Sequence, residues 1–258
     1  MLLALDAGNT NITVGIFRGG ALLDYRRLRT IREQTSDEWG ILLISLLRYA
    51  SLDPAEVRGI IISSVVPPIN SRLAEMAQRY FGLDPLFITS ETDTGLVIRY
   101  DNPAEVGADR IVNSVAALHK YGGPCVIVDL GTAITFDALS EKGEYLGGII
   151  AAGIGISVEA LFSRTARLPL VDFRKPAKVI GTNTVASMQS GLYYGAVGAI
   201  DGMIERLRGE LGVDTQVVAT GGQAGLIAGG SRYIRHVDEN LTLDGLHLLW
   251  QRLRKNTQ

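Results

Sequence analysis

The sequence predicts an α/β fold made of two duplicated halves, and two observations support this prediction. First, an Asp-x-Gly turn that ends one apolar strand and opens another occurs twice, at Asp6-Ala7-Gly8 and at Asp129-Leu130-Gly131. The two aspartates lie 123 positions apart, close to half of the 258 residues. Second, short β-branched apolar runs alternate with longer segments whose apolar residues follow the period of a helix.

The first half is expected to have the order β-β-β-α-β-α-β. Its first helix follows a capping box formed by Thr35 and Glu38, and its second begins at Pro67 and ends at Gly82. The strand 59–65 is apolar and β-branched, which is typical of a buried parallel strand. The expected strands are 2–6, 12–17, 21–29, 59–65 and 86–89.

The second half begins in the same way. A helical stretch is expected over 156–167, a long helix over 184–211 and a terminal helix over 241–254. The join between the halves falls near a helix over 108–121, which Gly122 ends. We therefore expect one domain over residues 1–117 and a second over 118–258. The strands expected in the second half are 125–130, 133–139, 144–150 and 217–220.

The long helix carries an unusual number of glycines. Each glycine inside a helix costs about 1 kcal/mol relative to alanine. Several on one helix indicate close backbone packing against a neighbour, such as a second subunit. These glycines are Gly191, Gly195, Gly198 and Gly202.

The composition is that of an ordinary globular protein, with 47% hydrophobic residues and a net charge of −2. This balance gives no reason to expect binding to nucleic acid or to an acidic membrane. No apolar stretch approaches the ~18 residues of a membrane helix, so a cytoplasmic protein is expected. The single cysteine, Cys125, lies in an apolar run, so we expect it to be a small core residue. The histidines, His119, His236 and His247, lack the spacing of a zinc site.

Each Asp-x-Gly turn places a carboxylate at a strand end and hydroxyl or amide side chains just beyond it. Taken alone, the segment from Asp6 to Asn11 fits a surface hairpin turn and a phosphate loop equally well. Its repetition at Asp129 favours phosphate, with the backbone N–H groups of residues 8–11 as donors. Gly221-Gly222 after an apolar strand is a weak signal alone, and next to two phosphate loops it becomes a place for a nucleoside.

A third feature is the segment Gly107-Ala108-Asp109-Arg110 at a helix start. A carboxylate in the first turn of a helix interacts favourably with the helix dipole, and an arginine there often forms a surface ion pair. From the residues alone, a purely structural role for this segment is slightly favoured.

The four motifs together resemble type III pantothenate kinases, in order and spacing and over essentially the whole chain. They are Asp6-Ala7-Gly8-Asn9-Thr10, Gly107 to Arg110, Asp129-Leu130-Gly131-Thr132-Ala133 and Thr220-Gly221-Gly222. That family looks like part of the superfamily of actin, hexokinase and the ATP-driven heat-shock chaperones. The resemblance implies two ribonuclease-H-like domains with mixed sheets flanked by helices and an ATP cleft between them.

The resemblance also implies a reaction and a set of roles. ATP would phosphorylate the 4′-hydroxyl of pantothenate, the first step toward coenzyme A, with Asp109 as catalytic base. Asp129 would hold a monovalent cation (K⁺ or NH₄⁺), and Asp6 a Mg²⁺ directly or through water. The implied partners are ATP, pantothenate and a second copy of the chain, whose Thr184 would reach the substrate. The implied ATP-binding residues are Asp6, Ala7, Gly8, Asn9, Thr10, Asn11, Ile12, Thr13, Thr132, Gly221 and Gly222, and those for pantothenate are Tyr100, Gly107, Ala108, Asp109, Arg110 and Thr184.

Two alternatives stay open at this point. The first is a regulatory, nucleotide-sensing member of the superfamily that has lost turnover, against which the retention of Asp6, Asp109 and Asp129 argues. The second is a kinase for another small hydroxyl substrate such as a sugar. Small bacterial sugar kinases often carry a cysteine-rich zinc motif, and this chain has one cysteine.

Overall fold

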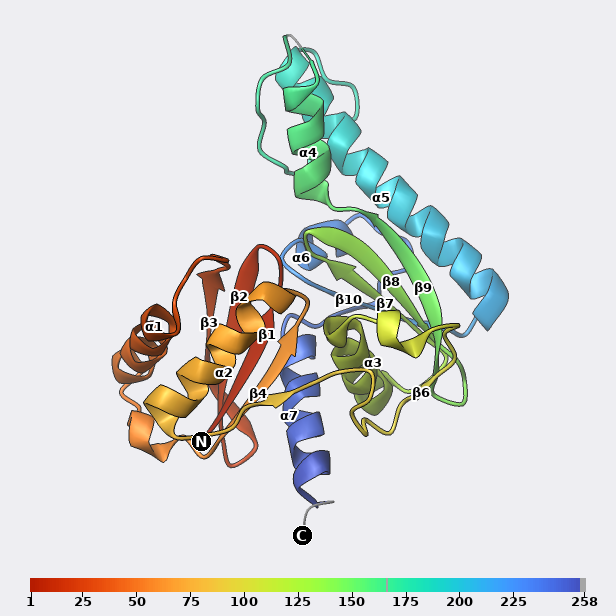
Figure 1. Ribbon diagram of the computed structural model, residues 1–258. Helices are drawn as coiled ribbons and strands as arrows, with labels where there is room; N and C mark the ends of the chain where they lie inside the picture. Colours follow the sequence, from red (N-terminus) through yellow and green to blue (C-terminus); the bar gives the residue numbers. More distant parts are fainter. Residues whose placement is uncertain (166, 256–258) are drawn as a thin grey trace. The chain divides into compact units, whose positions relative to one another are not determined.

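The computed structural model describes residues 1–165 and 167–255, which form two compact units (Figure 1). Unit 1 consists of Met1–Leu96, Asp101–Ala116 and the C-terminal stretch from Thr242, and unit 2 consists of Val97–Tyr100 and Ala117–Leu241. The helix α3 (Ala108–Tyr121) passes from one unit to the other.

Unit 1 is built on a five-stranded sheet with the order β3-β2-β1-β4-β5. β1 pairs antiparallel with β2 and parallel with β4, so the two chain directions mix at the centre. Helices α1 (Ser36–Tyr49) and α2 (Pro67–Phe81) bury their apolar faces on one face of this sheet. The capping box of Thr35 and Glu38 is confirmed. The strands are β1 (Leu2–Ala7), β2 (Asn11–Arg18), β3 (Ala21–Arg29), β4 (Gly59–Ser64) and β5 (Leu86–Phe87).

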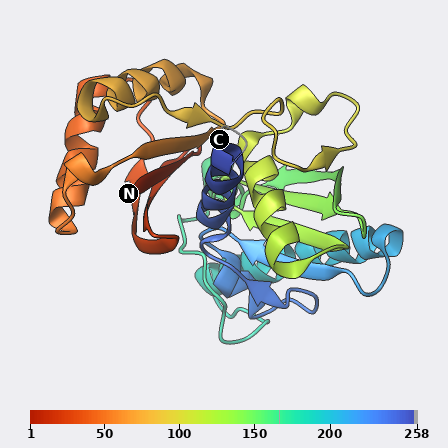
Figure 2. The ribbon, with the colours of Figure 1, turned by 90° about the horizontal axis from the view of Figure 1, so that it is seen from below.

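The C-terminal helix α7 (Leu241–Lys255) lies beside the same sheet (Figure 2). Two glycines of the sheet allow α7 to approach the strands closely. An added Cβ at Gly15 would lie 3.0 Å from Leu243, and one at Gly59 would overlap the Trp250 ring. The expected domain of 118–258 included this helix. The structure places it in unit 1 instead, because its apolar side chains complete the burial of the first sheet.

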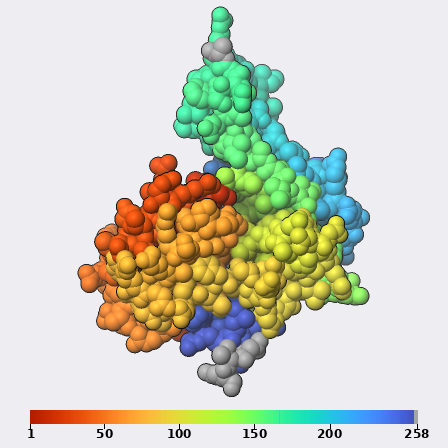
Figure 3. All heavy atoms as spheres, in the orientation of Figure 1, coloured from red at the N-terminus to blue at the C-terminus, as the bar shows by residue number. Residues whose placement is uncertain are grey.

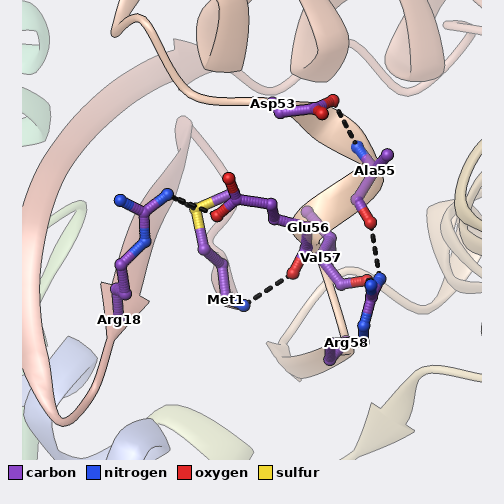
Figure 4. A network of polar contacts seen from close by, with 7 residues as sticks. All are labelled: Met1, Arg18, Asp53, Ala55, Glu56, Val57 and Arg58. Carbon is purple, nitrogen blue, oxygen red and sulfur yellow. Dashed lines mark hydrogen bonds and ion pairs between the residues drawn. The ribbon is translucent and has the colours of Figure 1, made fainter.

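The start of β1 is held by a polar network (Figure 4). The Met1 amino group donates to the Glu56 carbonyl over 2.7 Å, and Arg18 at the end of β2 forms an ion pair of 2.5 Å with the Glu56 carboxylate. Glu56 belongs to the short helix η1 (Pro54–Glu56), which Asp53 caps. The network therefore joins Met1, the end of β2 and η1 at the end of β1 opposite Asp6.

Unit 2 repeats the topology of unit 1. Its sheet has the order β11-β10-β7-β8-β9-β6. The first five strands correspond to β5-β4-β1-β2-β3, which is the order of the first sheet read in the opposite direction, and β6 is an additional edge strand. The pairing directions also match, with β7 antiparallel to β8 and parallel to β10. The strands are β6 (Val97–Ile98), β7 (Cys125–Leu130), β8 (Ala133–Leu139), β9 (Glu144–Ala152), β10 (Gln216–Thr220) and β11 (His236–Val237).

Helix α5 (Thr184–Leu211) packs its apolar side chains on the second sheet. Helix α4 (Ile154–Ser163) and the first turns of α5 extend away from that sheet as a projection (Figure 3). The stretch expected to be helical over 156–167 begins earlier, at Ile154, and ends at Ser163, and residue 166 of that range lies outside the described residues. The shorter helices are η2 (Pro103–Glu105) and α6 (Ala224–Ala228).

The predicted fold class is confirmed: two mixed sheets of matching topology are each flanked by helices. Cys125 is buried in β7, and burial raises the pKa of its thiol to about 12, so the thiol stays protonated. Among the described residues no helix is long and apolar enough to cross a membrane.

Candidate functional site

Asp6 lies near the end of β1 with a hydroxyl residue beside it on each neighbouring strand. It pairs with Thr13 on β2 and with Ser63 on β4. Residues directly opposite each other share a face of the sheet, with Cβ atoms about 4.5–5.5 Å apart in an antiparallel pair. Oxygen atoms from three strands therefore gather at this point of unit 1. Ser63 was not predicted, because it follows Ile60, Ile61 and Ile62 in a run without alternation of apolar and polar residues.

Asp129 occupies the equivalent place in unit 2. It pairs with Thr135 on β8 and with Thr220 on β10. The duplicated turns therefore carry the same row of hydroxyl, carboxylate and hydroxyl. The repetition extends to chemistry as well as topology.

The first loop uses part of its backbone internally. The Gly8 N–H donates to the Asn11 carbonyl over 3.0 Å, so the expectation that residues 8–11 all offer free N–H groups is wrong for Gly8. Thr30, directly after β3, holds the loop: its hydroxyl donates to the Gly8 carbonyl over 2.7 Å and its N–H to the Thr10 carbonyl over 2.9 Å. The side chains of Asn9 and Thr10 are exposed.

The second loop is packed against two glycines remote in sequence. An added Cβ at Gly221 would lie 2.7 Å from Asp129 Oδ1 and 2.8 Å from the Leu130 carbonyl oxygen, and Gly221 has φ +90°. An added Cβ at Gly153, just before α4, would overlap the Thr132 carbonyl oxygen. The structure thus brings Asp129, Thr132 and Gly221 together, and it adds Gly153, which sequence reasoning missed.

Gly107 to Arg110 lies at the same edge of unit 1 as the first loop. An added Cβ at Gly107 would be 3.5 Å from Val65 Cγ1, and the Val65 N–H donates to the Ala7 carbonyl over 3.0 Å. The same Cβ would lie 2.6 Å from Asp109 Oδ1. A side chain at position 107 would displace the Asp109 carboxylate, which folds back over the Gly107 Cα.

The Asp109 carboxylate is held in a mostly buried place at the start of α3. Its Oδ1 accepts the Arg110 N–H over 2.8 Å. Burial raises its pKa above the usual aspartate value, and the hydrogen bond and charge of Arg110 oppose that rise. A carboxylate with a raised pKa is a better proton acceptor than an ordinary one, which suits a general base.

Tyr100 lies over bare backbone in unit 2. An added Cβ at Gly147 would lie 3.3 Å from the Tyr100 ring, and that ring is 6.3 Å from the ring of Tyr145 between centroids. The Tyr145 hydroxyl donates to the buried Asp137 over 2.9 Å. Gly147 and Tyr145 thus support Tyr100, and neither was predicted.

Thr184 lies apart from these clusters, as the first residue of α5. Asn183 uses its side-chain oxygen to cap the helix at the Ala186 N–H over 2.9 Å, which leaves Thr182 and Thr184 exposed. A groove of about 830 Å³ runs beside them between α4 and α5.

The side chains present fit hard cations. Mg²⁺ is held in proteins by one or two carboxylates together with water and substrate phosphates, and the absence of a Cβ at Gly221 avoids a clash with the Asp129 carboxylate. Asp6 with its flanking hydroxyl residues offers the same chemistry.

Comparison with known proteins agrees with these features. The family model of type III pantothenate kinase matches residues 2–206. The chain is 64% identical to the type III pantothenate kinase of Solibacter usitatus, covering 98% of this chain and 97% of that one, and 56% identical to that of Koribacter versatilis, covering 100% and 98%.

Two solved structures share the fold at low identity. A Baf family transcriptional activator from Campylobacter jejuni has a TM-score of 0.61 at 18% identity, covering 98% of this chain and 99% of that one. Component A of the (R)-2-hydroxyglutaryl-CoA dehydratase of Acidaminococcus fermentans has a TM-score of 0.59 at 14% identity, covering 100% and 99%. On the family model and the full-length identities, the chain belongs to the type III pantothenate kinase family.

Proposed function

We propose that this protein transfers the γ-phosphoryl group of ATP to the 4′-hydroxyl of pantothenate, the first step of coenzyme A synthesis. The observation that carries the proposal is the placement of Asp109, a mostly buried carboxylate of raised pKa, at the same edge of unit 1 as the first loop. Family membership and identity over the full length support the substrate pair.

The residues take roles that follow from the needs of phosphoryl transfer, which are alignment and charge neutralisation. The first loop binds phosphate oxygens through Asn9, Thr10 and Asn11, because from Ile12 onward the chain is paired on both sides within the sheet. Asp109 accepts the proton of the substrate hydroxyl as the bond to phosphorus forms. Arg110 and Tyr100 position pantothenate, together with the backbone at Gly107 and Ala108. In unit 2, Thr132 binds phosphate, and the backbone at Gly221-Gly222 lies against the nucleoside.

Two cations complete this assignment. Asp6 holds Mg²⁺, directly or through water, and Asp129 holds a monovalent cation, K⁺ or NH₄⁺. When bound, these ions neutralise charge on the phosphate oxygens. The protein's part is to present carboxylate and hydroxyl oxygens of fixed position, as the rows around Asp6 and Asp129 do.

The expected result with purified protein, ATP, Mg²⁺ and K⁺ is ADP release that depends on pantothenate. Detection of 4′-phosphopantothenate by mass spectrometry identifies the product. ATP binding without such release would instead indicate a nucleotide sensor, and turnover with a sugar would indicate a different kinase. Omission of K⁺ tests the requirement for a monovalent cation in the same assay.

We also propose a homodimer in which the exposed face of α5 meets a second copy of the chain. An added Cβ at Gly191, Gly195 or Gly198 would meet nothing within 4 Å in the described part of the chain, so these glycines serve no packing within it. Large apolar side chains are exposed on and beside the projection: Ile150, Ile156, Phe162, Leu170, Val179, Ile180, Val185 and Tyr194. In the dimer, Thr184 of one copy would reach pantothenate bound to the other.

Gly195→Leu is expected to convert the dimer to a monomer. Leucine is a better helix former than glycine and has room within the chain, so the fold should persist while a close helix contact is blocked. Light scattering after size exclusion measures the mass, and circular dichroism checks the fold. Gly209→Leu, at the other end of α5 and equally free of neighbours, is the matched control and should stay dimeric. A dimeric Gly195→Leu protein would contradict this interface.

A further inference from the structure

Arg27 on β3 stands in the same cross-strand row as Asp6. The register pairs Asp6 with Thr13 and Thr13 with Arg27, so the three side chains share one face of the first sheet. Neighbouring strands lie about 4.8 Å apart. The long Arg27 side chain can therefore reach over Thr13 toward the first loop.

Arg27 and its sequence neighbour Arg26 lie on opposite faces of the first sheet. Arg26 lies on the face covered by α1 and α2, where Leu28 packs against the core, and it forms an ion pair of 2.9 Å with Asp24. Among the described residues Arg27 forms no ion pair, and its side chain is exposed. Its charge is thus available on the face that carries Asp6.

The duplicated half supplies a comparison. The corresponding row in unit 2 runs from Thr220 through Asp129 and Thr135 to Ile150. The two rows agree in their hydroxyl, carboxylate and hydroxyl positions and differ in the fourth, where unit 1 has a guanidinium and unit 2 an exposed isoleucine. The positive charge is therefore specific to the half that carries the first phosphate loop.

We infer that Arg27 binds a phosphate oxygen of ATP, as a nucleotide-binding residue of the reaction. This inference rests on the proposed kinase function. Around the first loop, Asp6 and Asp109 contribute negative charge, whereas Arg110 is buried, with 7% of its surface exposed. A polyphosphate next to carboxylates needs compensating positive charge, and a guanidinium provides it with directed N–H donors. Arginine on an edge strand can also serve only to prevent edge pairing.

Arg27→Gln is expected to raise the KM for ATP about ten- to a hundredfold, because a hydrogen bond to a charged group is lost. The KM for pantothenate and the affinity for adenosine should stay within about twofold. Arg27→Lys should retain part of the ATP affinity, and Arg27→Ile, which copies the row of unit 2, should resemble Arg27→Gln. Arg26→Gln on the opposite face is the matched control and should bind ATP normally.

Several outcomes would overturn the inference. They are a normal KM for ATP in Arg27→Gln, an increase confined to pantothenate, an equal loss of adenosine affinity, or a loss that appears in Arg29→Gln and not at Arg27. Binding of ATP and of adenosine can be measured without turnover. A wild-type protein inactive on pantothenate would therefore refute the proposed function while the comparison of ATP with adenosine still tests Arg27. Thermal unfolding of each variant verifies that the exposed substitution leaves the fold intact.

Discussion

Replacing Asp109 with asparagine is expected to lower kcat by a factor of about 10² to 10⁴, the usual range for loss of a general base. Asparagine keeps the size and the hydrogen bond to the Arg110 N–H but cannot accept the proton of the attacking hydroxyl. ATP affinity should not change, because Asp109 is assigned to the hydroxyl substrate. Steady-state kinetics and nucleotide binding by calorimetry measure the two effects separately.

The neighbouring Asp101→Asn serves as the control for this substitution. Asp101 is exposed and lies ahead of the short helix η2, so its change should leave kcat unaltered. A near-normal kcat in Asp109→Asn would contradict the assignment of Asp109 as the catalytic base. A joint loss of turnover and ATP binding would point to a structural role for the carboxylate.

The pH dependence of the wild-type enzyme offers an independent check of the same residue. Burial raises the pKa of Asp109, and a base acts in its deprotonated form. Activity should therefore fall as the pH drops through this raised pKa, at a pH above the ~3.9 of an ordinary aspartate. An acid limb of kcat/KM at or below that ordinary value would mean that another group accepts the proton.

The regular elements could be predicted because each has a local cause. The capping box at Thr35, the αL glycine Gly82 and the β-branched run of β4 act over a few residues, and the structure has these elements where the sequence predicted them. The two-residue strands β6 and β11 were not predicted, although the equally short β5 was. The assignment of α7 to unit 1 depends on packing against Gly15 and Gly59, which pattern alone does not reveal.

The residues of the candidate site also divide into those that a local motif predicts and those that only the tertiary fold brings together. Asp6, Asp129 and the segment from Gly107 to Arg110 could be predicted because each lies in a contiguous motif. The residues that hold these motifs in place could not be predicted, because they are distant in sequence: Thr30 donates to the Gly8 carbonyl across 22 positions. Gly8 is not among the glycines of positive φ, so the sharp turn does not depend on its conformational freedom.

Gly221→Ala is the second change for which we expect a large effect. The backbone there has φ +90°, which alanine adopts only with strain of about 1–3 kcal/mol. Its Cβ would also lie 2.7 Å from Asp129 Oδ1, so the carboxylate or the turn must move. We expect kcat at fixed K⁺ to fall by about tenfold or more and the K⁺ concentration for half-maximal activity to rise.

A K⁺ titration of the kinase activity, with thermal unfolding alongside it, distinguishes a displaced cation ligand from general destabilisation. Gly225→Ala in α6 is the control, since its added Cβ would meet nothing within 4 Å. If Asp129 holds the cation, raising K⁺ should recover part of the activity of Gly221→Ala, whereas a protein that is merely less stable gains nothing from K⁺ at a temperature where it is fully folded. An unchanged K⁺ requirement in a folded, impaired Gly221→Ala enzyme would therefore contradict the cation role of Asp129. The backbone contact between Gly221 and Asp129 would then serve the nucleoside alone.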